Sequence, residues 1–242
     1  MAKRQKKPAL RRKSRLRVWL LAALAGAGVF LYLQFGGCSQ TGSESGLSTF
    51  VSSLLGGGSV RIGIVAGHWK NDSGATCADG LSEVDITLDV AERTAGLLRR
   101  AGYKVDLLAE FDPKLEGYSA TAFVSIHADS CIKELSGFKV ARLPESQVPD
   151  AADRLVEALY REYAATTGLE AHTDTITYDM RSYHAFHEIS PKTPGAIIEI
   201  GFMGSDRELL TRRPDLVARG IARAVIDFVK GEEEAAGTPA GE

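Results

Sequence analysis

The stretch Pro194-Gly-Ala-Ile-Ile-Glu-Ile-Gly-Phe-Met203 is a short apolar run bounded by Pro and Gly, with one ionisable residue, Glu199, in its middle. A run of this length and composition is typical of a buried β-strand. A carboxylate is costly to desolvate, so Glu199 should sit at an exposed strand end, pair with another group or face a metal ion. The simplest interpretation is a strand-end carboxylate bound to a neighbouring arginine or backbone N–H.

Strand-like and helix-like segments alternate along the chain around this stretch. The strand-like segments are apolar and short, at residues 60–66, 103–109, 122–128, 137–141 and 196–200. The helix-like segments carry apolar residues at helical spacing, from Ser82 to Gly102, from Asp150 to Thr167 and from Pro214 onward. Such alternation predicts an α/β domain, a three-layer sandwich with a mostly parallel, twisted sheet.

The N-terminus has the pattern of a membrane anchor. Residues 1–17 hold nine Lys or Arg and no acid, and an apolar run follows within residues 18–35. The run is at the short end of what a bilayer requires of a helix, and the basic block predicts a single-pass transmembrane helix with its N-terminus in the cytoplasm. A secretory signal peptide that is cleaved is the alternative, but no Ala-x-Ala site follows the run. Either interpretation places the rest of the chain outside the cytoplasm.

The remaining segments divide the chain further. Residues 36–59 are rich in Ser, Gly and Thr, which predicts a flexible linker, and residues 231–242 carry an acidic run that predicts a disordered tail. The folded domain is therefore expected at residues 60–230. After residue 17 the chain has 20 basic against 31 acidic residues, so we do not expect nucleic acid as its partner.

Three further polar residues fall where the loops of a parallel sheet collect. His68 follows the first strand by two residues, His127 ends the strand at 122–128, and Glu83 lies in the first turn of a helix. Sites in open parallel sheets lie beyond the carboxyl ends of the strands. Each residue alone is more often structural, but two imidazoles and one carboxylate are a recurrent ligand set for catalytic zinc. A metal ion would also explain the position of Glu199, which would then act as general base.

Four motifs in this order resemble one enzyme family. Gly67-His68, Gly80-Leu-Ser-Glu83, Ser125-Ile-His-Ala128 and Ile198-Glu-Ile-Gly-Phe202 are similar to the zinc-dependent N-acetylmuramoyl-L-alanine amidases of bacterial cell walls, the type-3 amidases. The resemblance implies one Zn²⁺ held by His68, Glu83 and His127, with Glu199 as the catalytic residue. It also implies peptidoglycan as substrate, with hydrolysis of the amide between N-acetylmuramic acid and L-alanine of the stem peptide.

The chain departs from the family in three places. After Phe202 it has Met203-Gly-Ser205, where the family commonly has Leu-Ser-Asn. Trp69 and Lys70 follow His68, where the family usually has two glycines. The segment at 110–119 is shorter than usual and lacks the expected arginine pattern. All three departures leave the proposed ligands in place and concern the surroundings of the site.

Residues 183–187, which precede the strand of Glu199, are rich in aromatic and histidine residues. They could place His184 or His187 over the site, and Arg181 could meet the carboxylates of a stem peptide. The simpler interpretation is that these histidines are solvated and that Arg181 forms an ordinary surface ion pair.

Cys77 lies six residues before Glu83, and Cys131 lies four after His127. If both ligands bind one ion, the two cysteines are close neighbours. A disulfide is expected in an oxidising compartment. Two buried thiols, or a thiolate ligand to zinc, are the alternatives.

Two other functions fit the same residues. The first is a zinc peptidase that cuts within the stem peptide, and the second is a wall-binding module without turnover. A binding module would not need Glu199, which favours an enzyme.

Overall fold

The computed structural model describes residues 60–237 of the chain. The predicted membrane segment at 18–35, its basic flank at 1–17 and the predicted linker at 36–59 lie outside the described residues. Within the described part, no helix combines the length and the apolar character that crossing a bilayer requires.

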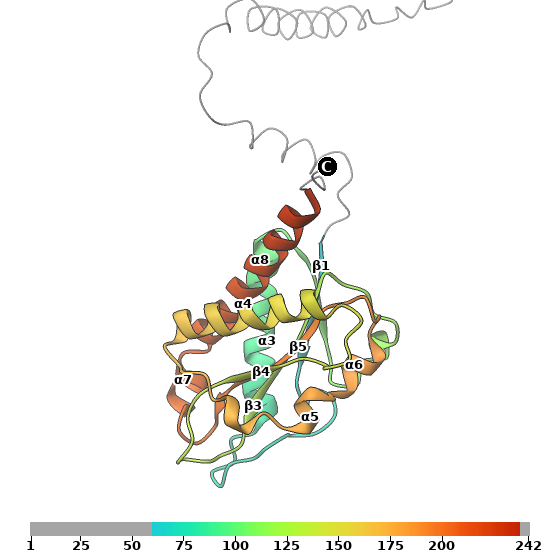
Figure 1. Ribbon diagram of the computed structural model, residues 1–242. Coiled ribbons are helices and arrows are strands. Elements are labelled where there is room, and N and C mark those ends of the chain that lie inside the picture. Colours follow the sequence, from blue (N-terminus) through green and yellow to red (C-terminus); the bar gives the residue numbers. More distant parts are fainter. Residues whose placement is uncertain (1–59, 238–242) are drawn as a thin grey trace, which may run out of the picture. The chain divides into compact units, whose positions relative to one another are not determined.

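Five strands form one sheet in the order β2-β1-β3-β5-β4 (Figure 1). Their bounds are β1 Arg61–Ala66, β2 Lys104–Leu108, β3 Ala122–Asp129, β4 Lys139–Ala141 and β5 Gly195–Phe202. β2, β1, β3 and β5 pair in parallel, and only the short β4 runs antiparallel to its neighbour. The predicted, mostly parallel α/β sheet is therefore confirmed.

The three long helices cover one face of the sheet. They are α3 Glu83–Arg100, α4 Pro149–Thr167 and α8 Pro214–Gly237. Alternate residues of β1, β3 and β5, such as Ile64, Ile126 and Ile198, pack with these helices into the larger hydrophobic core. α4 crosses the direction of α3 in Figure 1, and α8 packs against both of them.

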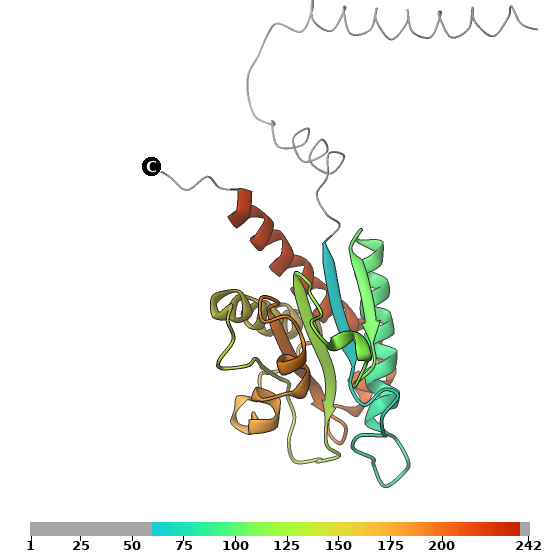
Figure 2. The same cartoon turned by 90° about the vertical axis from the view of Figure 1, so that its right-hand side faces the viewer.

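The other face of the sheet is covered by shorter elements. These are η1 Pro113–Leu115, α5 Tyr178–Arg181 and α6 His184–Glu188, with η2 Thr173–Thr175 beside β4. A second, smaller core forms here, and it includes Leu115, Tyr183 and Phe186. The sheet thus has a cover on each side, but the cover on this side is built from single turns and loops (Figure 2). α7 Arg207–Arg212 lies between β5 and α8 in the sequence.

The last helix extends further than the sequence predicts. The acidic run that begins at Gly231 was expected to be disordered, yet α8 continues through Gly237. Glu232 accepts a hydrogen bond from Arg154 of α4 at 2.7 Å, which attaches this final part of α8 to the domain. The prediction of disorder from residue 231 is therefore wrong for residues 231–237.

Candidate metal centre

His68 is held in a tight turn directly after β1. The N–H of Gly67 donates to the carbonyl of Ile126 in β3 (2.9 Å), and the N–H of Trp69 donates to the carbonyl of Ala66 (3.1 Å). Within this turn His68 has a φ of 65°, in the left-handed region that non-glycine residues rarely adopt. Strain of this kind is found mainly at functional sites, where the surrounding contacts maintain it.

Lys70 also has a positive φ, 63°. It stands where the resembled family usually has glycine, which adopts this conformation without strain. Its ammonium group lies 4.2 Å from the centre of the Trp69 ring. Trp69 and Lys70, which stand where the family usually has two glycines, thus contact each other.

Glu83 begins α3 and is almost completely buried. Its two carboxylate oxygens accept hydrogen bonds from backbone N–H groups, Oε2 from Ala75 at 3.0 Å and Oε1 from Ala128 at 3.1 Å. Oε1 also lies 3.2 Å from Nε2 of His68 and 3.2 Å from Nδ1 of His127. One carboxylate oxygen therefore bridges the two imidazoles.

His68, Glu83 and His127 come from three separate segments and meet at one edge of the sheet. One potential ligand atom from each lies within 4.8 Å of the others, and no other group of this kind occurs among residues 60–237. The two rings stand edge to face, with centroids 5.1 Å apart. The structure therefore brings together the three residues that the sequence suggested as ligands.

Two glycines allow this close approach. A Cβ atom on Gly67 would lie 2.6 Å from the ring of His127, and one on Gly74 would lie 2.6 Å from Oε2 of Glu83. Neither distance is compatible with a real side chain. The site therefore depends on the absence of side chains at these two positions.

Glu199 lies beside the cluster in the sheet. It pairs in register with His127 of β3 on one side and with Lys139 of β4 on the other, so the three side chains share one face of the sheet. Oε2 of Glu199 is buried and has no hydrogen-bond partner in the described structure. Burial raises the pKa of Glu199 to about 7, against the opposing effect of His127. A carboxyl group that titrates near neutral pH suits a general base.

The pKa values of the candidate ligands are shifted by their contacts. The pKa of His68 is raised to about 9, chiefly by its hydrogen bond to Glu83. Burial alone would raise the pKa of Glu83, but hydrogen bonds to His127 and His68 outweigh it and lower the value to about 2. Without an ion, the cluster therefore holds a carboxylate and protonated imidazole, and a cation that binds must displace protons.

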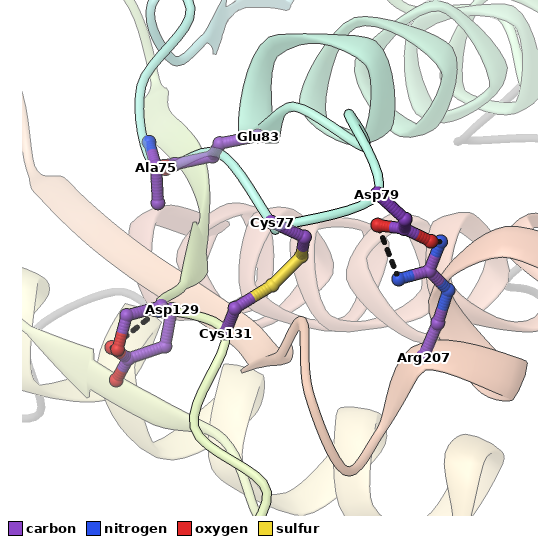
Figure 3. Close-up of a disulfide and its surroundings, with 8 residues drawn as sticks. Ala75, Cys77, Asp79, Glu83, Asp129, Cys131 and Arg207 are labelled. Atoms are coloured by element: carbon purple, nitrogen blue, oxygen red, sulfur yellow. Dashed lines mark hydrogen bonds and ion pairs between the residues drawn. A yellow bond between two sulfur atoms is a disulfide. The ribbon is translucent and has the colours of Figure 1, made fainter.

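A disulfide joins the loop before Glu83 to the loop after His127 (Figure 3). Cys77 lies in the loop before α3 and Cys131 in the loop after β3, with their Cα atoms 5.5 Å apart. The expected pairing is confirmed, and the alternatives of free thiols or a thiolate ligand are not supported. Asp79 in the same loop forms an ion pair with Arg207 of α7 at 2.5 Å, which fixes the loop to the domain.

The three candidate substrate residues lie in different surroundings. His184 has both ring nitrogens engaged, Nε2 at 3.0 Å from Glu110 and Nδ1 at 2.7 Å from Glu188. His187 is exposed and lies 3.1 Å from the hydroxyl of Ser182. Arg181 is exposed in the wall of a hollow that it forms with Arg142 and Ile176. Only His184 is connected to the cluster, through Glu110.

Two carboxylates at the site were not predicted from the sequence. Asp72 lies 2.6 Å from Nδ1 of His68, and Glu110 lies 3.6 Å from Nε2 of His127. Glu110 follows the end of β2 by two residues, as His68 follows β1. The rule that places His68 at the sheet edge would therefore have found Glu110 as well.

The comparison with protein families agrees with this geometry. The family described as N-acetylmuramoyl-L-alanine amidase, Amidase_3, matches residues 62–227, most of the described domain. The chain belongs to this amidase family. All four site residues named above, His68, Glu83, His127 and Glu199, lie within the matched region.

Solved structures of amidases share the fold. AmiC2 of Nostoc punctiforme is 23% identical with a TM-score of 0.56, and the match covers 72% of this chain and 99% of that one. CwlD of Clostridioides difficile, solved with the GerS lipoprotein, is 20% identical with a TM-score of 0.57 over 71% and 99% of the chains. Ami1 of Mycobacterium smegmatis is 17% identical, with a TM-score of 0.54 over 71% and 97%. No curated protein sequence gives a significant match.

The residues of this amidase fit a single zinc ion. Two imidazoles and one carboxylate are a donor set typical of catalytic zinc, which leaves a further position open. Their potential ligand atoms already lie close together around Oε1 of Glu83. Oε2 of Glu199 is buried without a hydrogen-bond partner in the described structure, and Glu199 is paired in register with His127 in the sheet.

Proposed function

We propose that this amidase hydrolyses the bond between N-acetylmuramic acid and L-alanine of the stem peptide in peptidoglycan, with one zinc ion held by His68, Glu83 and His127. The observation that carries the proposal is the convergence of these three potential ligand atoms within 4.8 Å. Family membership supports the amidase reaction and the peptidoglycan substrate.

Bound zinc would polarise the scissile carbonyl and make water acidic enough to attack near neutral pH. The chain supplies the proton transfers. Glu199 accepts a proton from the attacking water and passes it to the nitrogen of the leaving amine. Its position beside His127 and its pKa near 7 both favour this role.

Asp72 and the backbone N–H groups of Ala75 and Ala128 orient the metal ligands and do not contact the ion themselves. Asp72 accepts the Nδ1–H of His68, which leaves Nε2 free toward the ion. The N–H groups of Ala75 and Ala128 hold the carboxylate of Glu83 in one orientation. The ligand geometry is thereby set before an ion binds.

Substrate contacts are a separate part of the proposal. Arg181, His184 and His187 lie on or next to the short helices α5 and α6, on the same face of the sheet as His127 and Glu199. We assign them to binding of the stem peptide. Variants that raise KM without changing kcat would support this role, and variants without effect on either would remove it.

The test is digestion of purified sacculi with the zinc-loaded protein. An amidase frees peptides that begin with L-alanine and leaves intact glycan strands. Peptides cut inside the stem, with L-alanine still joined to the lactyl group of muramic acid, would instead establish the alternative zinc peptidase. Binding to sacculi without any released product would establish a wall-binding module.

We further propose that residues 18–35 anchor the enzyme in the membrane with its catalytic domain outside the cytoplasm. The basic block at residues 1–17 and the apolar run that follows support this topology. Fractionation of cells that produce the full chain tests it. Recovery in the membrane pellet at full length is expected, and a shortened form in the medium would show cleavage and secretion.

A further inference from the structure

The two ring nitrogens of His127 have different surroundings. Nδ1 faces Oε1 of Glu83 at 3.2 Å, on the side of the proposed ion. His127 is only 7% exposed, and its Nε2 is buried without a hydrogen-bond partner in the described structure. A buried polar atom without a partner is costly, so a polar group close to it matters. Oε2 of Glu110 lies 3.6 Å from Nε2 of His127.

Glu110 is fixed in place by contacts with two separate segments, residues 68–69 and residues 183–184. Oε2 accepts a hydrogen bond from the backbone N–H of His68 at 2.7 Å, and Oε1 accepts one from the hydroxyl of Tyr183 at 3.0 Å. Nε2 of His184 lies 3.0 Å from Oε1, and the backbone N–H of Glu110 donates to Trp69. The residue is 5% exposed. Its carboxylate is therefore a rigid acceptor behind the ring of His127.

The other histidine shows the same arrangement. Nε2 of His68 faces Glu83 at 3.2 Å, and its Nδ1 lies 2.6 Å from Oδ1 of Asp72. The same oxygen of Asp72 accepts the N–H of Gly74 at 2.8 Å. Each imidazole thus has a carboxylate on the nitrogen that faces away from Glu83. Such outer carboxylates commonly fix the tautomer and orientation of histidine ligands.

We propose that Glu110 is a positioning residue that accepts the Nε2–H of His127 and so presents Nδ1, unprotonated, to the metal ion. A shift of about 0.5 Å brings the pair from 3.6 Å into the N–H···O range. The inference rests on the proposed metal site. Glu110 is not part of the ligand group itself, whose three members are His68, Glu83 and His127.

The first test measures zinc affinity by competition with a chromophoric chelator. Glu110→Gln keeps the shape of the side chain but removes the charge, and it should weaken zinc binding about 10- to 100-fold. Glu116→Gln, an exposed glutamate in the same segment, is the matched control and should bind zinc like the unaltered protein. Equal affinity of Glu110→Gln and the unaltered protein, with lowered melting temperature only, would reduce Glu110 to a structural role.

The second test is decided on the unaltered protein, with Glu110→Gln as an added comparison. Long-range ¹H–¹⁵N spectra of the zinc-loaded, unaltered protein should show His127 coordinated through Nδ1 and protonated at Nε2. The Nε2–H proton should move upfield in Glu110→Gln, because a neutral amide is a weaker acceptor than a carboxylate. Coordination through Nε2 would overturn the proposal. An unaltered protein that binds no zinc would instead overturn the metal site, and this role with it.

Discussion

His127 and Glu199 are direct neighbours across the sheet, paired in register on the parallel strands β3 and β5. Because paired residues point to the same face, a proposed ligand and a proposed base are placed side by side by backbone hydrogen bonds alone. The backbone of Glu199 is held by its pairing with β3, more firmly than a loop would hold it. Lys139, on the other side of Glu199, continues this row onto β4 and is itself buried.

The first prediction concerns the base. Glu199→Gln should retain zinc and lose turnover by about 10²-fold or more, because an amide cannot accept the proton. Zinc content by atomic absorption and sacculus digestion, measured on the same preparation, check it. Glu208→Gln, on the exposed surface of α7, should leave both properties unchanged. A Gln variant with full turnover would remove Glu199 from the mechanism.

The second prediction concerns the turn before His68. Gly67→Ala should impair zinc binding, because its Cβ would lie 2.6 Å from the ring of His127 and force the ring away. Chelator competition is the measurement. Gly96→Ala in α3 is the control, since its Cβ meets only the end of Arg100 at 3.4 Å. That variant should bind zinc normally and gain up to about 1 kcal/mol of stability from helix propensity. Normal zinc affinity in Gly67→Ala would show that the ring can yield.

Much of this arrangement can be predicted from the sequence. The apolar runs that become β1, β3 and β5 are continuous because these strands are buried on both faces, and that pattern is specific to parallel sheets. The rule that sites collect at the carboxyl ends of such strands then places His68 and His127 together. Glu83 follows because α3 begins where the loop after β1 returns to the sheet.

Other features could not be predicted, for physical reasons. The position of Glu110 two residues after β2 places it at the sheet edge, but its role depends on tertiary contacts with His68, Tyr183 and His127 that this spacing does not show. The acidic run from Gly231 predicts a disordered tail, because such runs usually stay solvated. α8 instead continues through Gly237, and Glu232 accepts a hydrogen bond from Arg154 of α4. Arg181 lines a hollow with Arg142 and Ile176, and His187 lies beside Ser182, so their role in binding the stem peptide stays a prediction.

The third prediction concerns the disulfide. Replacement of Cys77 and Cys131 by serine should lower the free energy of unfolding by about 4 kcal/mol on the chain-entropy estimate, given a sequence separation of 54. Denaturant unfolding of the metal-free protein measures this. Zinc affinity should fall as well, because the disulfide joins the loop before Glu83 to the loop after His127. An unaltered stability, or two alkylatable thiols in the unaltered protein without reductant, would contradict the prediction.

The fourth prediction uses the titration of His68 in the metal-free protein. Its pKa in the folded state is raised from 6.5 to about 9, chiefly by the hydrogen bond to Glu83. A raised pKa means that the folded state holds the proton more tightly than the unfolded state. The resulting stabilisation is fully present below pH 6.5 and is lost as the pH rises through 9.

Melting temperatures of the metal-free protein between pH 6 and 10 check this dependence. His68→Gln should melt below the unaltered protein at pH 6, and the difference should shrink as the pH approaches 10. His187→Gln, which alters an exposed histidine outside the cluster, should follow the unaltered protein throughout. In the zinc-loaded protein the imidazole of His68 is already neutral, so this part of the pH dependence should disappear. A gap between His68→Gln and the unaltered metal-free protein that stays constant over the whole range would show that the charge of His68 does not stabilise the fold.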